Sequence, residues 1–168
     1  LMNPAVRESA ASPMRGIALL GSDFAVAVTG DGGVWLIRVT DDGTRRRSAE
    51  LVHASAGSRW SKVHAATVAG GALILVGSAT GEALLLALHA IECQGEAVGI
   101  GAGPSVASGA GETKFEDKAV VLVRWQAHRT CIMQFHWAGN VPPLARIDGA
   151  YLISADATGR MATWRVEE

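Results

Sequence analysis

The chain has 168 residues, of which 49% are apolar and 18% are charged, and its formal net charge is −1. This length and composition suffice for one domain with a sizeable core and exclude a disordered, highly charged chain. The small net charge provides no overall field that attracts nucleic acid or an anionic membrane. Two cysteines, Cys93 and Cys131, are too few for a disulfide framework, and nothing at the N-terminus resembles a secretion signal. We therefore expect an intracellular protein, cytoplasmic or nuclear.

The first predicted elements are a strand and a hairpin. Residues 1–13 contain two prolines and no sustained hydrophobic period, which predicts an N-terminal tail or linker. Residues 14–20 are a short apolar strand candidate. In residues 22–39 two apolar runs flank Asp31-Gly32, which is the pattern of a strand, a tight turn and a second strand.

The connection that follows is polar and basic. It contains a polar turn, then the triplet Arg45, Arg46 and Arg47, and then a strand candidate at 49–54. Basic clusters of this kind can bind phosphate. Acidic residues balance the triplet locally and no aromatic residue is interleaved with it, so the sequence favours a solvated loop over a phosphate contact.

A second hairpin occupies residues 71–88, after a loosely alternating stretch at 60–68 that predicts an inner strand. Residues 72–91 include a single charge, Glu82, and by hydropathy alone they would suggest a membrane span. Gly81 and its neighbours interrupt this run where the first hairpin also turns, and the flanks lack the anchors of a spanning helix. A hairpin that is covered on both faces explains the same apolar density.

Residues 92–118 predict a Gly-rich inserted loop. The part from 95 to 111 is dominated by Gly, Ala and Ser, and its repeated glycines invite comparison with a phosphate-binding loop. It has neither the Gly-Lys-Ser/Thr ending nor the strand-turn-helix context that such loops require. Few large apolar residues are present to offset the entropy of ordering, so we expect a surface loop.

The last predicted elements repeat the pattern once more. Strands are expected at 119–125 and 130–137, followed by a loop that contains Pro142 and Pro143. Residues 149–166 then form a third hairpin.

The three hairpins place a glycine at the same point of the turn, at Gly32, Gly81 and Gly159. The first two glycines are 49 residues apart and the last two are 78 residues apart. Removing the insertion at 92–118 restores a period of about fifty. Periods of about 40–50 residues with several short strands are typical of propeller blades.

Residues 121–166 resemble a blade of the WD-repeat family. They contain an outer strand, Ala127-His128 in place of the usual Gly-His, an inner strand, and the run Leu-Ile-Ser-Ala-Asp-Ala-Thr-Gly-Arg-Met-Ala-Thr-Trp. The resemblance covers nearly all of residues 14–166 outside the insertion, with the first two units departing further from the pattern. It implies an all-β fold over residues 14–168, a partial β-propeller of about three four-stranded blades.

In that family a His, a Ser or Thr, a turn Asp and a Trp often form a hydrogen-bonded set that fixes the strands. By position, the resemblance assigns these structural roles to His128, Ser154 and Trp164. Thr158 stands at the Asp position and leaves the set incomplete, unless Asp156 substitutes for it. His53 is a possible counterpart of His128 in the second unit.

Three units are fewer than a closed propeller needs, since such rings have about four to eight blades. The terminal units would leave an apolar face and a strand edge uncovered. We therefore expect this chain to be part of a larger propeller, completed by a missing segment or by another chain.

The expected function is that of a non-catalytic scaffold or adaptor that mediates protein–protein interactions, with Arg45, Arg46, Arg47, Pro142 and Pro143 in the candidate contact loops. The histidines and cysteines lack metal-ligand spacing and no nucleophile elbow is present. We expect no catalysis, metal, cofactor, membrane or small-molecule substrate. The alternative is an accessory subunit of an RNA- or DNA-associated complex that contacts phosphate through the arginine triplet.

Overall fold

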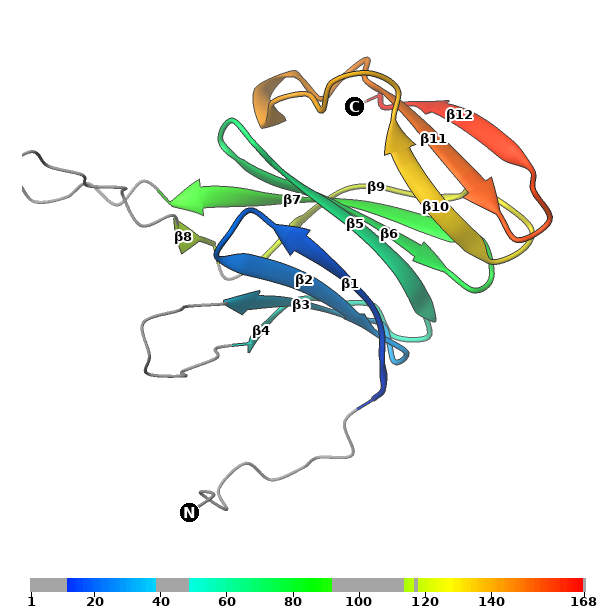
Figure 1. The fold of residues 1–168 in the computed structure, drawn as a ribbon, viewed down its shortest axis with the longest axis horizontal. Helices are drawn as coiled ribbons and strands as arrows, with labels where there is room; N and C mark the ends of the chain where they lie inside the picture. The colour runs from blue at the N-terminus through cyan, green and yellow to red at the C-terminus, as the bar shows by residue number, and fades with distance from the viewer. Residues whose placement is uncertain (1–11, 39–48, 92–113, 117, 168) are drawn as a thin grey trace, which may run out of the picture.

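The computed structural model describes residues 12–38, 49–91, 114–116 and 118–167, which form three antiparallel sheets side by side (Figure 1). Within these ranges there is no α-helix, and the one helical segment is a single 3₁₀ turn, η1 (Leu144–Arg146). The prediction of an all-β fold is therefore confirmed.

Each sheet is a meander in which successive strands pair antiparallel. The first sheet contains β1 (Met14–Leu20), β2 (Phe24–Thr29), β3 (Gly33–Arg38) and β4 (Ala49–Ala54). The second contains β5 (Trp60–Val68), β6 (Gly71–Ser78), β7 (Glu82–Ile91) and β9 (Val120–Gln126), with the short β8 (Lys114–Phe115) also paired to β7. The third contains β10 (Ile132–Trp137), β11 (Tyr151–Asp156) and β12 (Met161–Arg165).

The hairpins predicted from the sequence are present as β2–β3, β6–β7 and β11–β12. The apolar run at 72–91 is the β6–β7 hairpin, and within the described ranges no helix has the length and apolar character to cross a membrane.

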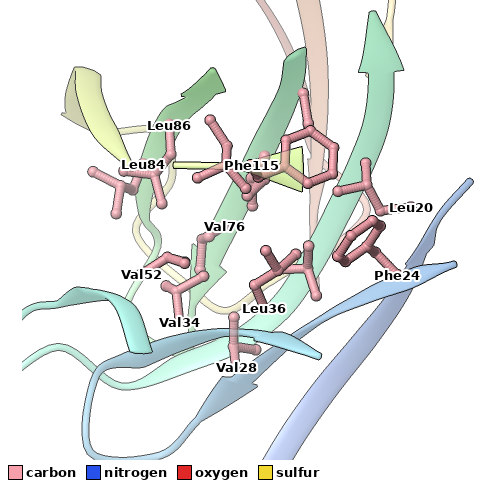
Figure 2. Close-up of a cluster of buried hydrophobic side chains, with 14 of the residues drawn as sticks. Leu20, Phe24, Val28, Val34, Leu36, Val52, Val76, Leu84, Leu86 and Phe115 are labelled. Atoms are coloured by element: carbon pink, nitrogen blue, oxygen red, sulfur yellow. The ribbon is translucent and has the colours of Figure 1, made fainter. Parts of the chain in front are cut away.

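The second sheet is buried on both faces because a sheet lies on each side of it. Alternate residues of β6 enter different cores, with Ile74 and Val76 facing the first sheet and Leu73 and Leu75 facing the third. Figure 2 shows the core between the first and second sheets, where Val28 and Leu36 meet residues of β6 and β7. This two-sided burial explains why the hairpin lacks the alternation of a half-exposed strand pair.

Two expectations need correction. Residues 92–113 and 117 of the expected loop lie outside the described residues, but its end is structured as β8. Phe115 is buried and its ring packs edge-on against Phe24, with centroids 5.0 Å apart. The third sheet also differs, because it has three strands in the described part of the chain instead of the expected four.

The three hairpin turns are built alike. In each one the glycine N–H donates to the carbonyl oxygen three residues earlier, at 3.2 Å for Gly32, 3.3 Å for Gly81 and 3.0 Å for Gly159. All three glycines have positive φ, at 94°, 87° and 80°. Side chains other than glycine rarely adopt this conformation, which explains the glycine at each turn.

The repetition extends to the inner strands. β1, β5 and β10 each begin opposite the first residue of their own hairpin turn, and each has a register shift directly afterwards. The residue before each strand also accepts a backbone hydrogen bond from the second residue of that turn. The three acceptors are Pro13 (3.2 Å), Arg59 (3.0 Å) and Cys131 (2.9 Å).

Consecutive sheets are joined by short linkers, residues 55–59 and 127–131, that pack on the preceding turn glycine. The Ser55 N–H donates to the Gly32 carbonyl oxygen at 3.0 Å, and the His128 N–H donates to the Gly81 carbonyl oxygen at 3.0 Å. A Cβ at either glycine would overlap the carbonyl oxygen of the linker residue. At Gly159, in contrast, a Cβ meets no atom within 4 Å.

This difference predicts that Gly81→Ala destabilises the protein more than Gly159→Ala. The positive φ costs about 1 kcal/mol at both positions, because alanine disfavours the left-handed region. At Gly81 the overlap with the His128 carbonyl adds about 2 kcal/mol, since backbone must move. The check is the free energy of unfolding in urea for both variants. Equal losses would contradict the described linker contact.

Candidate functional site

The third sheet contains a buried polar set around Ser154. The Trp164 indole N–H donates to Ser154 Oγ at 2.8 Å, and His128 Nε2 lies 2.7 Å from the same oxygen. Since an indole can only donate, Ser154 Oγ accepts from Trp164 and its own hydroxyl hydrogen can go to His128. The structure therefore brings together the three residues that the sequence assigned to one set.

Asp156 joins this set from the end of β11. Its Oδ2 lies 3.5 Å from His128 Nδ1 and accepts a hydrogen bond from the Thr130 hydroxyl at 3.0 Å. Its Oδ1 accepts from the Thr158 N–H at 2.9 Å, the Thr158 hydroxyl at 2.7 Å and the Arg160 N–H at 3.0 Å. Asp156 thus supplies the carboxylate, and Thr158 is one of its donors.

These hydrogen bonds determine the charge of Asp156. The residue is buried, and burial alone raises the pKa of a carboxyl. The donors from Thr158, Arg160 and Thr130 outweigh burial and lower the pKa of Asp156 to about 2. An ionised carboxylate therefore faces His128 at neutral pH.

A serine, a histidine and an aspartate in this order also occur in hydrolases, so the two uses must be compared. A catalytic serine has to reach a substrate and has an oxyanion-stabilising group beside it. Ser154 is 0% exposed, and its oxygen already accepts the hydrogen of Trp164. The arrangement is thus suited to holding β11, β12 and the second linker together.

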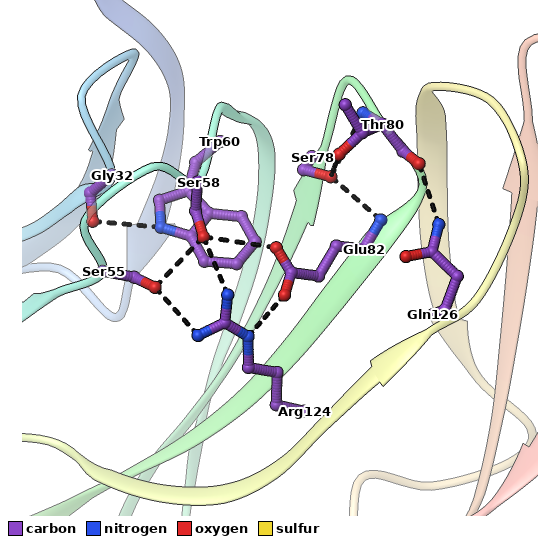
Figure 3. A network of polar contacts seen from close by, with 9 residues as sticks. All are labelled: Gly32, Ser55, Ser58, Trp60, Ser78, Thr80, Glu82, Arg124 and Gln126. Atoms are coloured by element: carbon purple, nitrogen blue, oxygen red, sulfur yellow. Dashed lines mark hydrogen bonds and ion pairs between the residues drawn. The ribbon is translucent and has the colours of Figure 1, made fainter.

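A second polar set lies between the first and second sheets (Figure 3), and sequence reasoning missed it. The Arg124 guanidinium forms an ion pair with Glu82 and donates to Ser55 Oγ and Ser58 Oγ, both at 3.1 Å. Ser58 also donates to Glu82 at 3.2 Å. Nearby, the Trp60 indole donates to the Gly32 carbonyl oxygen at 3.0 Å. This set ties the first linker to the hairpin of the second sheet.

The suggested role of His53 is wrong. The linker residue that packs on Gly32, as His128 packs on Gly81, is Ser55. His53 lies in β4 opposite Val34, where burial and the charge of Arg124 lower its pKa.

Of the two predicted contact loops, the structure describes only the one that contains Pro142 and Pro143. Arg45, Arg46 and Arg47 lie outside the described residues. Pro142 and Pro143 are half-buried and precede η1, and their neighbours Val141 and Leu144 pack against the core between the second and third sheets. The Leu144 N–H also donates to the Ala69 carbonyl oxygen at 3.2 Å. Part of this loop is therefore committed to the core.

An open cavity of about 410 Å³ adjoins the polar set of the third sheet. Its lining comes from the end of β9, the second linker and the β11–β12 hairpin, and consists of Gln126, Ala127, His128, Arg129, Asp156, Arg160, Met161 and Ala162. Within the described ranges, no three His, Cys, Asp or Glu side chains come together as metal ligands would.

Comparison with known proteins gives no relatives: no family model, no curated protein and no solved structure matches this chain. Function therefore has to be inferred from the molecule's own geometry.

Replacing the central hydroxyl tests the polar set. We expect Ser154→Ala to lower the free energy of unfolding by about 2 kcal/mol, because the Trp164 indole and the His128 ring lose a buried partner. Thr163→Ala, at an exposed position on β12, should change it by less than about 0.5 kcal/mol. Urea denaturation of both variants measures the difference, and similar values for the two would argue against the set.

The low pKa of Asp156 predicts a pH dependence of stability. A carboxyl with a pKa of about 2 when folded and 3.8 when unfolded stabilises the fold above about pH 4. This contribution is lost as the pH falls toward 2. The difference in unfolding free energy between the native chain and Asp156→Asn should therefore shrink over that interval. A difference that stays constant from pH 5 to pH 2 would refute the assignment.

Proposed function

We propose that this chain is a run of three blades of a WD-repeat-like β-propeller, and that it acts as a non-catalytic scaffold or adaptor for protein–protein interactions. In this proposal it works within a larger propeller or a multiprotein complex. The repeated turns, linkers and inner strands support the blade assignment. So do the contacts of β5 with both β1 and β10, which place the three first strands next to one another.

The observation that carries the proposal is an apolar face on the first sheet. By register, two rows of apolar residues cross all four strands on the face opposite the core: Leu19, Ala25, Ile37 and Ala49, and Ile17, Ala27, Trp35 and Leu51. Leu19 is 75% exposed and Ile17 is 59% exposed. No described sheet covers this face, although its two central alanines, Ala25 and Ala27, are themselves buried.

The equivalent faces of the second and third sheets indicate what this face of the first sheet contacts. In the second sheet, the equivalent face carries Ile74 and Val76 and packs against the first sheet. In the third, it carries Leu152 and packs against the second. An apolar sheet face of this extent is typical of protein contact sites. The same face on the first sheet therefore suits another protein surface, such as a preceding blade.

The polar residues support a scaffold rather than a catalyst. Both polar sets hold linkers and hairpins in place through hydrogen bonds, and Ser154, the hydroxyl that most resembles a nucleophile, is fully buried. Their contribution is therefore rigidity of the sheets.

Sedimentation velocity of the isolated chain tests the proposal. We expect the chain to associate with increasing concentration, because no described sheet covers the face around Leu19. Leu19→Lys should reduce this association, since a charge on the face opposes its burial. Thr67→Lys, at an exposed position on β5, is the matched control and should leave association unchanged. A native chain that is monomeric, soluble and cooperatively folded at all concentrations would contradict the proposal.

Salt dependence separates this function from phosphate binding through Arg45, Arg46 and Arg47. Contacts through an apolar face should persist as salt rises from about 50 to about 200 mM. Binding through three arginine–phosphate contacts falls by roughly 20- to 40-fold over the same interval. A steep loss of partner binding would therefore favour the nucleic-acid alternative.

A further inference from the structure

We propose that the third sheet accepts a fourth strand along β12 from another polypeptide segment, and that this strand places an acidic side chain beside Arg129 and Arg160. The inference rests on the proposed blade architecture and adds the chemistry of the segment that completes the last blade. It follows from comparing the third sheet with the second.

Among the described residues, no strand pairs with the outer edge of β12. The first sheet ends in β4 and the second has β9 beyond β7, whereas in the described part of the chain the third sheet ends at β12 (Figure 1). Between β11 and β12, residue pairs that exchange hydrogen bonds alternate with pairs that exchange none. Met161, Thr163 and Arg165 belong to the second kind, so their N–H groups point away from β11. These groups are available to an added strand.

The second sheet shows what the fourth strand does there. Arg124 of β9 lies opposite Leu84, the third residue after the turn glycine. From this position its guanidinium reaches Glu82, the first residue after that glycine, and Ser55 of the preceding linker (Figure 3). One side chain of the fourth strand thus connects the linker to the hairpin.

The cavity of the third sheet stands at the equivalent place. Counting from the turn glycine, Ala162 corresponds to Leu84 and Arg160 to Glu82. His128 corresponds to Ser55 by its contact with the preceding glycine. His128, Arg160 and Ala162 all line the cavity of about 410 Å³. The space that Arg124 fills in the second sheet is therefore open in the third.

The charge of this space is reversed relative to the second sheet. Glu82, which pairs with Arg124, is replaced by Arg160, and a second arginine, Arg129, also lines the cavity. Among the described residues neither arginine belongs to an ion pair. The one lining carboxylate, Asp156, is already occupied by three donor residues and faces His128.

These contacts determine which side chain fits. An arginine or lysine would face two guanidinium groups without a free carboxylate. A glutamate or aspartate would gain charge-assisted hydrogen bonds from one or both arginines. Ala162 is also smaller than Leu84, which leaves room for the incoming side chain. The occupant is therefore an extended segment with an acidic residue opposite Ala162.

The experiment uses two peptides that reproduce β9 and the start of its linker, residues 120–128. One has the native sequence with Arg124, and the other carries Arg124→Glu. Fluorescence anisotropy measures the binding of each peptide to the full chain. We expect the Arg124→Glu peptide to bind about tenfold more tightly, as one or two charge-assisted hydrogen bonds allow.

A charge swap on the protein provides the decisive comparison. In the Arg160→Glu variant the preference should reverse in favour of the native peptide. Arg146→Glu is the matched control, because Arg146 is exposed in η1 and does not line the cavity, and it should leave the preference unchanged. If Arg160→Glu does not fold, Arg129→Glu is used instead. It should weaken the preference for the Arg124→Glu peptide.

Each outcome decides a separate point. Equal binding of both peptides would overturn the acidic preference but keep strand addition. Absence of binding by either peptide, also when it is fused to the C-terminus through a flexible linker, would overturn strand addition. Neither result depends on the first sheet, whose association tests the proposed function independently.

Discussion

The contact between a linker and the preceding turn glycine is the constraint on which the arrangement of the sheets depends. The Gly32 and Gly81 carbonyl oxygens accept the N–H groups of Ser55 and His128, and each glycine also provides the positive φ that its turn requires. Because one residue fixes both the hairpin and the start of the next sheet, the spacing between sheets is set by backbone geometry. Side chains then complete the joint in a different way each time, with Arg124 at one joint and the Ser154 set at the other.

Much of the fold could be predicted from the sequence because its signals are local. A glycine between two apolar runs specifies a hairpin whatever the rest of the chain does, and all three hairpins were found in this way. Phe115 could not be placed, since its partner Phe24 is distant in sequence and its surroundings have a loop-like composition. The expected fourth strand of the third sheet, which the described residues do not contain, could not be decided either, because a repeat period predicts strands but not which segment supplies them.

The polar sites were predictable only where the resemblance supplied a pattern. His128, Ser154 and Trp164 were assigned by position, but the role of Asp156 was left open. The first and third turns each contain one threonine and one aspartate, but in opposite order. In both, the carboxylate accepts a turn N–H and the threonine hydroxyl, so its place in the turn is not fixed by the pattern. The network of Arg124 gave no signal at all, because its partners lie 42 to 69 residues before Arg124 in sequence.

The short strand β8 has a consequence for the Gly-rich stretch that precedes it. Ile91 pairs with Lys114, and Ala90 pairs with Phe115, so the chain leaves and re-enters the second sheet at adjacent points. The entropy of closing a loop between fixed ends rises only slowly with its length. A change in the number of residues between these two fixed ends therefore alters the entropy of closure only slightly, which makes this a natural place to insert an affinity tag.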